Sequence, residues 1–506
     1  MKLSQMLLAL LSAAVLAAPF LEPKLFPLAW FGFVPLFWTV KHAHTWRWAT
    51  FYGWLMGTGA HLIGFYWLVY TISAFGEFPY AVSVIVFIIY AALQAFEIAF
   101  FALFLRIAGW GPLCLFPPMF WVAVEFLFPL LFPWHVANSQ IAFSWFVQSA
   151  DLVGPYGASF IVVWFNATVY KILSTRPRAE PSAFGPLACS TVALILSLVY
   201  GFERLKTVEQ EMTSAPKLAT GAVQGNVDID LKWDPVLAQR NLNQHRKITD
   251  SLNSSALVIW PESAIEFMVP ENLRVLPPEF MPSFESPQTY FIFGAKSFSG
   301  TLGRPGMKAF NTAFFTDAQG RILGRYHKQV LLAFGEYLPF SRILSLLPGI
   351  PFADGFTAGQ GPIAFQLSSN IRVAPLICYE DLMPDLARKF VSETHANLLV
   401  NLTNDAWYGR SVGPWQHLTL ARSRAIETRR TLLRVTNTGV TSLVNAKGEV
   451  VKTLPMFTAA AMPAEVDILN SETYYVRFGD WFAWGMTIVS IAVVAAGLKR
   501  SIRRVA

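Results

Sequence analysis

Charged residues and cysteines are both scarce in this sequence. Asp, Glu, Lys and Arg make up 14% of the 506 residues, whereas a soluble domain carries about a quarter. There are three cysteines, and an odd number gives no complete disulfide framework. Runs of like charge with interleaved aromatic residues are also missing, although the net charge is +7. These absences argue against a disulfide-stapled secreted domain and against a nucleic-acid-binding surface.

Apolar residues are abundant instead. They make up 54% of the chain, with 43 Phe and 17 Trp, and fill residues 1–202 almost continuously. Most of these stretches approach the ~20 residues that cross a bilayer. We therefore expect a membrane domain over 1–202 with seven transmembrane helices, and a final transmembrane helix at 479–499. The eight expected spans lie near 5–21, 26–40, 50–72, 80–105, 113–133, 157–173, 184–202 and 480–498.

Lysine and arginine are distributed unevenly over the short loops between these stretches. One side of the alternation carries most of them, and the other carries Lys24 and little else. The positive-inside rule then puts both termini in the cytoplasm and the segment after the seventh span outside it. The residues on the basic side are Lys2, Lys41, Arg47, Arg106, Lys171, Arg176, Arg178, Lys499, Arg500, Arg503 and Arg504.

The segment 217–472 differs from the flanking regions because short apolar runs alternate there with helical patterns. Continuous apolar strands between helices predict an α/β fold whose strands are covered on both faces. The expected strands are 219–226, 256–260, 290–295, 371–377 and 397–402, and the expected helices are 236–253 and 412–430.

Three reactive side chains sit at or just beyond strand-like runs of this segment. Glu262 follows Ile259-Trp260-Pro261, Lys328 follows Arg325-Tyr326-His327, and Cys378 ends the apolar run 371–377. Taken singly, each has an ordinary explanation as a turn carboxylate, a solvated lysine or a small core residue. Together, an acid, an amine and a thiol are the groups required for acyl transfer through a thioester.

The remaining cysteines and the histidines suggest no second reactive centre. Cys114 and Cys189 lie in apolar segments, where a cysteine usually serves as a small hydrophobic side chain. His327, His395 and His417 are irregularly spaced and match no metal-binding motif. We therefore expect neither a metal nor a cofactor. His61 and His135 have no role that the sequence suggests.

The trio, in the order Glu, Lys, Cys, resembles the nitrilase superfamily. The resemblance covers roughly residues 217–470 and implies an α-β-β-α sandwich. The chain as a whole is similar to the bacterial apolipoprotein N-acyltransferases, in which such a domain precedes the last of eight membrane helices. The matching runs are Ile259-Trp260-Pro261-Glu262, Tyr326-His327-Lys328 and Leu376-Ile377-Cys378-Tyr379-Glu380.

This resemblance implies a role for each member of the trio. Glu262 would be the general base, Lys328 would stabilise the oxyanion, and Cys378 would be the nucleophile. Four further positions match the family pattern as supporting residues, namely Trp233, Glu336, Tyr379 and Glu380. Glu336 and Glu380 would raise the proton affinity of Glu262, or Glu380 would orient Lys328; a purely structural ion-pair role is open for both.

The resemblance also implies the substrates. A phospholipid would donate an acyl chain to the thiol, and the N-terminal amine of a diacylglyceryl-cysteine lipoprotein would accept it in a ping-pong reaction. The enzyme would sit in the bacterial inner membrane with its catalytic domain on the periplasmic side. The apolar stretch 337–356 is interpreted as a lid that guides acyl chains, with core burial as the alternative.

Two other functions remain open from the sequence. A membrane-tethered amidase acting on a small amide would need the same trio, although eight spans exceed what an anchor requires. A transporter or scaffold with an inactive nitrilase-like domain would need charged residues within its spans, and Glu97 and Glu125 are the main ones. Asn401, Asn404 and Asp405 are expected at a strand-end turn near the site, with a supporting role possible.

Overall fold

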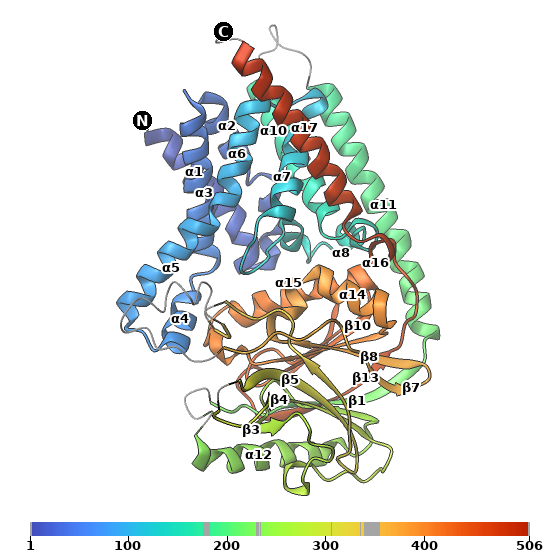
Figure 1. Cartoon of the computed structure of the whole chain (residues 1–506). Coiled ribbons are helices and arrows are strands. Elements are labelled where there is room, and N and C mark those ends of the chain that lie inside the picture. The colour runs from blue at the N-terminus through green and yellow to red at the C-terminus, as the bar shows by residue number, and fades with distance from the viewer. Residues whose placement is uncertain are drawn as a thin grey trace. The chain divides into compact units, whose positions relative to one another are not determined.

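The computed structural model describes residues 3–175, 183–228, 232, 234–304, 306–333, 335–337 and 355–503. The chain divides into two compact units. The helical unit comprises Met1–Thr207 and Thr473–Ala506, and the sheet unit comprises Val208–Glu472. Each unit is built from a different periodicity, one helical and apolar, the other alternating strands with helices (Figure 1).

The helical unit consists mostly of apolar α-helices. Close packing is made possible by small residues: a Cβ on Gly53 would lie 2.6 Å from the Cβ of Ala102, so glycine lets two helices approach. The main helices are α1 Leu3–Leu21, α2 Val34–His42, α3 Trp46–Gly64, α4 Leu68–Gly76, α5 Tyr80–Gln94, α6 Phe96–Ala108, α7 Phe116–Leu127, α10 Tyr156–Ser174, α11 Phe184–Ser214 and α17 Trp481–Arg503. Short elements complete the unit: η1 Pro23–Trp30, η2 Pro112–Cys114, η3 Val136–Gln140, α8 Ser144–Val147, α9 Ala150–Val153 and α16 Tyr474–Phe478.

The expected spans are matched unevenly by these helices. Among the described residues, five helices are long and apolar enough to cross a membrane, or six if the pair α3 and α4, bent by 71°, forms one span. The expected span 26–40 is interrupted, because the proline-containing η1 ends at Trp30 before α2 begins at Val34. Within the expected span 113–133, the α-helix is the shorter α7, which ends at Leu127. Helix α11 continues past the expected end at residue 202 as far as Ser214.

The described residues of the sheet unit form two sheets. One has the strand order β13-β1-β2-β4-β5-β6 with β3 paired to β4, and the other has the order β12-β11-β10-β9-β8-β7. Strands β1, β2 and β4 are parallel neighbours, as are β8, β9 and β10. The bounds are β1 Lys217–Gln224, β2 Leu257–Ile259, β3 Ile265–Pro270, β4 Tyr290–Ser299, β5 Lys308–Asp317, β6 Ile322–His327, β7 Phe365–Ser368, β8 Ile371–Ile377, β9 Leu398–Thr403, β10 Thr431–Thr436, β11 Ser442–Val444, β12 Val450–Thr453 and β13 Ala460–Asp467.

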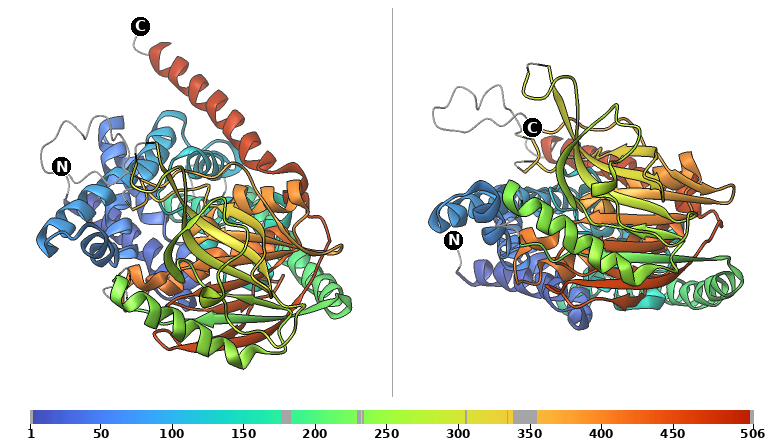
Figure 2. Two further views of the ribbon diagram at one scale, coloured as in Figure 1. Left: turned by 60° about the horizontal axis from the view of Figure 1, so that its bottom comes forward. Right: turned by 90° about the horizontal axis from the view of Figure 1, so that it is seen from below.

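Helices cover the outer faces of the two sheets. Figure 1 shows α14 Pro384–Thr394 and α15 Gly413–Thr428 over the sheet of β8 and β10, and α12 Pro235–Thr249 over the sheet of β3 and β4. Seen from below in Figure 2, α12 lies in front of the strands. This is the expected α-β-β-α sandwich. The short helical turns are η4 Asp250–Leu252, η5 Pro278–Phe280, η6 Cys378–Leu382 and η7 Asp405–Tyr408.

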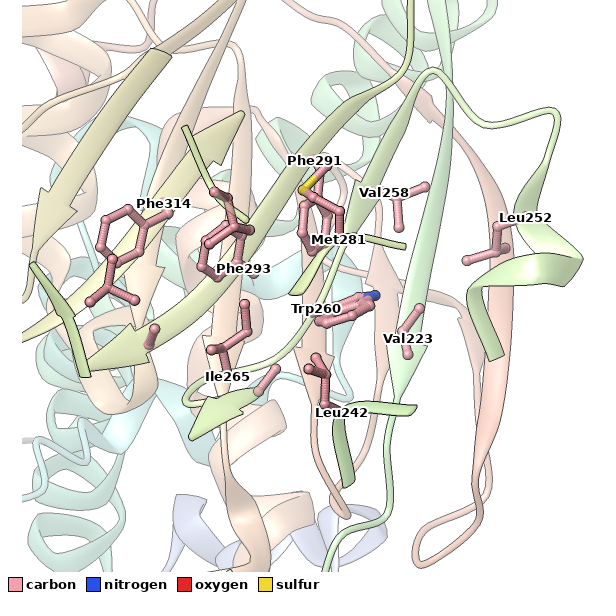
Figure 3. Close-up of a cluster of buried hydrophobic side chains, with 14 residues drawn as sticks. Val223, Leu242, Leu252, Val258, Trp260, Ile265, Met281, Phe291, Phe293 and Phe314 are labelled. Atoms are coloured by element: carbon pink, nitrogen blue, oxygen red, sulfur yellow. The ribbon is translucent and has the colours of Figure 1, made fainter. Parts of the chain in front are cut away.

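The core beneath α12 fixes the end of β2. Trp260 is fully buried, its ring centroid lies 4.9 Å from that of Phe291, and its Nε1 donates to the hydroxyl of Thr249 at 2.9 Å. Figure 3 shows Trp260 among the apolar side chains of this cluster, which include Val223, Leu242 and Phe293. A buried indole with its N–H paired holds the following residues in one position.

Candidate active site

The nucleophile candidate occupies a strained turn at the end of β8. Cys378 is the first residue of η6 and has φ +55°, in the left-handed region that side-chain-bearing residues rarely adopt. Its thiol is free, and the residue is 9% exposed. Asn401 on the neighbouring strand β9 donates from Nδ2 to the Cys378 carbonyl at 2.7 Å. The strand and this hydrogen bond together present the thiol at the carboxyl end of the sheet.

Glu262 lies in a second strained turn, at the end of β2. The next residue, Ser263, has φ +50°. The turn packs so closely on Gly294 of β4 that a Cβ there would lie 2.7 Å from the Glu262 Cα. Only glycine permits this approach. Glu262 is 8% exposed, its Oε1 accepts from Asn311 Nδ2 at 2.8 Å, and its backbone carbonyl accepts from Lys232 Nζ at 3.3 Å.

Lys328 follows β6 and forms a buried ion pair with Glu336. Its Nζ lies 2.7 Å from Glu336 Oε2, and the residue is 1% exposed. The same Glu336 accepts from Asn311 Nδ2 through Oε1 at 2.8 Å. Asn311, in β5, therefore links the carboxylates of Glu262 and Glu336 through one amide nitrogen. The sequence interpretation missed this residue.

The electrostatic environment couples the three reactive groups. Burial, and then the Glu262 carboxylate, raises the pKa of the Cys378 thiol well above its ordinary value, against the opposing effect of Lys328. Burial raises the pKa of Glu262 as well, while Lys328 lowers it and Glu336 raises it. Burial lowers the pKa of Lys328, but the charges of Cys378, Glu336 and Glu262 outweigh it, so the net pKa is raised. These shifts disfavour the thiolate of Cys378, make the carboxylate of Glu262 a stronger base and keep Lys328 positively charged.

Glu380, for which the sequence left several roles open, accepts hydrogen bonds from backbone N–H groups and from a tyrosine hydroxyl. Its Oε1 accepts from the backbone N–H of Gln329 at 2.7 Å and of Val330 at 3.0 Å, and its Oε2 accepts from the Ile377 N–H at 2.8 Å. The Tyr326 hydroxyl donates to both oxygens at 3.0 Å. Glu380 therefore ties the residue before Cys378 to the residues after Lys328. Burial raises its pKa to about 7, against the lowering effect of these backbone hydrogen bonds.

Tyr379 and Glu336 both contact Lys328. The Lys328 Nζ lies 5.2 Å from the ring centroid of Tyr379, and the Tyr379 hydroxyl donates to the Leu331 carbonyl at 2.8 Å. Trp233 and residues 338–354, which make up most of the expected lid, lie outside the described residues. Within the described part of the chain, no group of three or more His, Cys, Asp or Glu is arranged to hold a metal ion.

Glu97 and Glu125, the acids considered above for a transporter, are both buried in the helical unit. Glu125 accepts hydrogen bonds through Oε1 from Trp121 Nε1 at 3.0 Å, from the Val136 N–H at 2.7 Å and from the Ser159 hydroxyl at 3.1 Å. These contacts join α7, η3 and α10, which is the pattern of a structural carboxylate. Glu97 is buried, and neither of its carboxylate oxygens has a hydrogen-bond partner among the described residues.

A sandwich that carries Glu, Lys and Cys at its strand ends defines a nitrilase-type domain, and comparison with known families agrees. Residues 222–474 match the carbon-nitrogen hydrolase family, and residues 12–168 match the apolipoprotein N-acyltransferase N-terminal domain. The chain is 32% identical to an apolipoprotein N-acyltransferase of Geobacter metallireducens over 98% of this chain and 95% of that protein. It therefore belongs to the apolipoprotein N-acyltransferase family.

Other known proteins match at lower similarity. An apolipoprotein N-acyltransferase of Rickettsia prowazekii is 28% identical over 97% of each chain. Among solved structures, Saccharomyces cerevisiae Nit3, a member of the nitrilase superfamily, is 16% identical with a TM-score of 0.36, covering 50% of this chain and 90% of that chain.

Proposed function

We propose that this chain transfers an acyl group from a phospholipid to the N-terminal amine of a diacylglyceryl-cysteine lipoprotein, with Cys378 as the covalent carrier. The observation that carries the proposal is the buried, electrostatically coupled set of Glu262, Lys328 and Cys378 at strand ends, in a chain of the apolipoprotein N-acyltransferase family. Family membership makes the chain an acyltransferase of bacterial membranes.

The first half reaction forms a thioester. Because the thiol has a raised pKa, it needs a base, and Glu262, whose own pKa is raised, takes the proton. The thiolate attacks the ester carbonyl of the phospholipid, and Lys328 stabilises the oxyanion that forms. When the ester C–O bond breaks, Glu262 returns the proton to the leaving oxygen. Lysophospholipid departs, and the acyl group remains on Cys378.

The second half reaction consumes the thioester. The neutral α-amino group of the lipoprotein, whose ordinary pKa is about 7.7–8.0, attacks the thioester carbonyl. Glu262 accepts the amine proton as the amide forms, and the C–S bond breaks. The proton then passes to the departing thiolate, which restores the starting state. Two different partners that share one covalent intermediate give ping-pong kinetics.

The proposal includes a location. The uneven lysine and arginine distribution supports an inner-membrane enzyme with both termini in the cytoplasm and the sheet unit on the periplasmic side. A cysteine added after the C-terminus in a Cys114→Ala/Cys189→Ala/Cys378→Ala background, which has no other cysteine, tests this. In intact spheroplasts it should resist a membrane-impermeant maleimide and should react once the membrane is opened. Labelling in intact spheroplasts would contradict the orientation.

Intact-mass analysis tests the chemistry. The full chain in vesicles of one defined phospholipid should gain the mass of one acyl group, and hydroxylamine should remove it as expected for a thioester. Addition of a diacylglyceryl-cysteine peptide should transfer the mass to the peptide. Cys378→Ala should gain nothing, and Cys189→Ala is the matched control that should behave as wild type.

The same experiment separates the alternatives. A chain that gains no acyl mass but hydrolyses small amides would be a membrane-tethered amidase. Full biological activity of Cys378→Ala would favour a transporter or scaffold with an inactive domain.

A further inference from the structure

Four charged side chains lie buried together behind the Cys378 turn. His417 of α15 has its Nδ1 2.8 Å from Asp405 Oδ1 and its Nε2 2.8 Å from Asp381 Oδ1. Arg434 of β10 has its Nε 2.9 Å from Asp381 Oδ2 and an Nη 3.8 Å from Asp405 Oδ2. All four residues are at most 3% exposed. We call Asp381, Asp405, His417 and Arg434 the buried cluster.

The geometry of the buried cluster fixes the protonation of His417. A neutral imidazole has one N–H donor and one lone pair, so it can donate to only one of two carboxylates. Here both ring nitrogens face a carboxylate oxygen at 2.8 Å. A lone pair held at that distance from a carboxylate would be repulsive. The arrangement is favourable when His417 is an imidazolium that donates to Asp381 and to Asp405, and the cluster then carries two positive and two negative charges.

The buried cluster is joined to the nucleophile by short covalent and hydrogen-bonded paths. Asp381 lies in η6, the same short helical turn that begins with Cys378. Arg434 is paired in register with Asn401 across β9 and β10, and Asn401 donates to the Cys378 carbonyl. Asp405 acts on the thiol directly, because its charge raises the pKa of Cys378. A change in the cluster's charge is therefore felt at the sulfur.

We propose that the buried cluster positions the Cys378 turn and, through the imidazolium of His417, cancels the negative charge that would otherwise oppose thiolate formation. His417 is a positioning residue, since it acts through Asp381 and Asp405. The proposal rests on the function proposed above and adds to it an alkaline limit. When His417 loses its proton, the cluster gains one net negative charge next to the thiol.

The direction of the pH dependence follows from the groups that face His417. These are Asp381 of η6, Asp405 and Tyr408 of η7, and Arg434 of β10; the Tyr408 ring lies 5.7 Å from the imidazole. Burial lowers the pKa of His417 and so does Arg434, but the two aspartates raise it above its ordinary value. The stabilising effect is complete below about pH 6.5, the ordinary value, and is lost as pH rises through the raised pKa.

The test compares three variants with wild type in acyl-enzyme formation from one defined phospholipid between pH 6 and 10. His417→Gln leaves the cluster with a net negative charge and should slow acylation about tenfold, the effect of roughly one pKa unit on the thiol. Asp405→Asn/His417→Gln restores neutrality and should recover the rate to within about threefold of wild type. Wild type should lose rate on the alkaline side. The double variant should not, because it is neutral and has no histidine that can lose a proton. Asp405→Asn still titrates, from one net positive charge to zero, so its cluster never becomes negative and its rate should stay at or above that of wild type.

A second readout keeps the two proposals separable. The rate at which iodoacetamide alkylates Cys378, followed by peptide mass, reports thiolate formation without any lipid. It should fall about tenfold in His417→Gln and recover in the double variant. If wild type forms no acyl-enzyme, the proposed function fails, and alkylation still decides on the cluster. Should His417→Gln acylate and alkylate as wild type does, or should the double variant retain the alkaline loss, the cluster proposal is wrong. If His417→Gln does not fold, the pH profiles of wild type and the double variant decide.

Discussion

The two sheets of the sandwich contribute to the site by the same means but with different electrostatics. The sheet of β2 and β6 presents Glu262 and Lys328 at its strand ends, linked to Glu336 by Asn311. The sheet of β8 to β10 presents the thiol, supported by ion pairs in which the thiol itself takes no part. The charged side chains of the first sheet are proposed to take part in the reaction. Those of the second sheet support the turn that carries the nucleophile.

The difference separates two ways of using buried charge. Charges that act on a substrate need one side free, and Glu262 Oε2 has no hydrogen-bond partner within the described ranges. Charges that only support are paired with one another, as the two ring nitrogens of His417 are with Asp381 and Asp405. Substitutions on the first sheet should therefore change chemistry first, and those on the second should change stability and pH response first.

Removal of the thiol should have the largest effect. Cys378→Ala should reduce acyl transfer on the order of 10⁴-fold or more, because no covalent intermediate can form. Its thermal unfolding should match wild type, since the thiol belongs to neither ion-pair set. The measurement is lysophospholipid release together with a melting curve. Cys189→Ala is the control, and a large loss of stability in Cys378→Ala would contradict the separation of roles.

An added charge on the first sheet should come next. Asn311→Asp removes a hydrogen bond that lowers the pKa of Glu262 and places a third carboxylate beside Glu262 and Glu336. Both changes raise the pKa of Glu262, which must be ionised to act as base. The acidic limb of the pH–rate profile should therefore move up by about 1–2 units, with a loss of about 10²-fold at neutral pH. Asn243→Asp, on the exposed face of α12, is the control and should leave the profile in place.

The tie between the two sheets should give an intermediate effect. In Glu380→Gln an amide NH₂ replaces an oxygen that accepts backbone hydrogen bonds, so at least one N–H loses its acceptor. The free energy of unfolding should fall by about 2–3 kcal/mol. The raised pKa of about 7 means that ionisation of Glu380 costs wild-type stability as pH rises from about 4.5 through 7. The advantage of wild type should shrink over that range, and denaturant melts at several pH values measure it. Glu465→Gln, exposed on β13, should show neither effect.

Steric displacement of a carboxylate in the buried cluster should give the smallest effect. A Cβ on Gly439 would lie 2.3 Å from Asp405 Oδ2, so Gly439→Ala must displace that carboxylate. We expect a loss of about 1–2 kcal/mol in unfolding free energy, typical of an overpacked position. Gly485→Ala in α17, where a Cβ would meet nothing within 4 Å, is the control and should not lower stability. An unchanged melting temperature in Gly439→Ala would show that Asp405 has room to move.

The three reactive groups could be picked out from the sequence because each one lies at or just beyond a strand-like run. The expected strand 371–377 coincides with β8, and the strands expected near Glu262 and before Asn404 appear as β2 and β9. Asn311 could not be predicted because it lies inside β5, where no local pattern marks it. Its role arises only when β5 pairs with β6 and Glu336 folds back on Lys328.

The buried cluster as a whole and the interruption of the expected span 26–40 could not be predicted for related reasons, although Asp405 was expected at a strand-end turn near the site. The members of the buried cluster come from four separate elements. Only tertiary packing brings their charged groups into contact. His417 was considered only as a metal ligand. The expected span 26–40 was read from apolar composition, which does not detect the break at Phe31–Phe33 between η1 and α2.

The left-handed backbone of Cys378 has an evolutionary consequence. With φ +55°, this position favours glycine, so Cys378→Gly should be more stable than wild type by about 1 kcal/mol while being inactive. Selection for folding stability alone would favour replacement of this cysteine by glycine. Its presence at a position that penalises it is therefore a sign of selection for reactivity, and a Cys-to-Gly change at this turn in any descendant would mark a chain released from that selection.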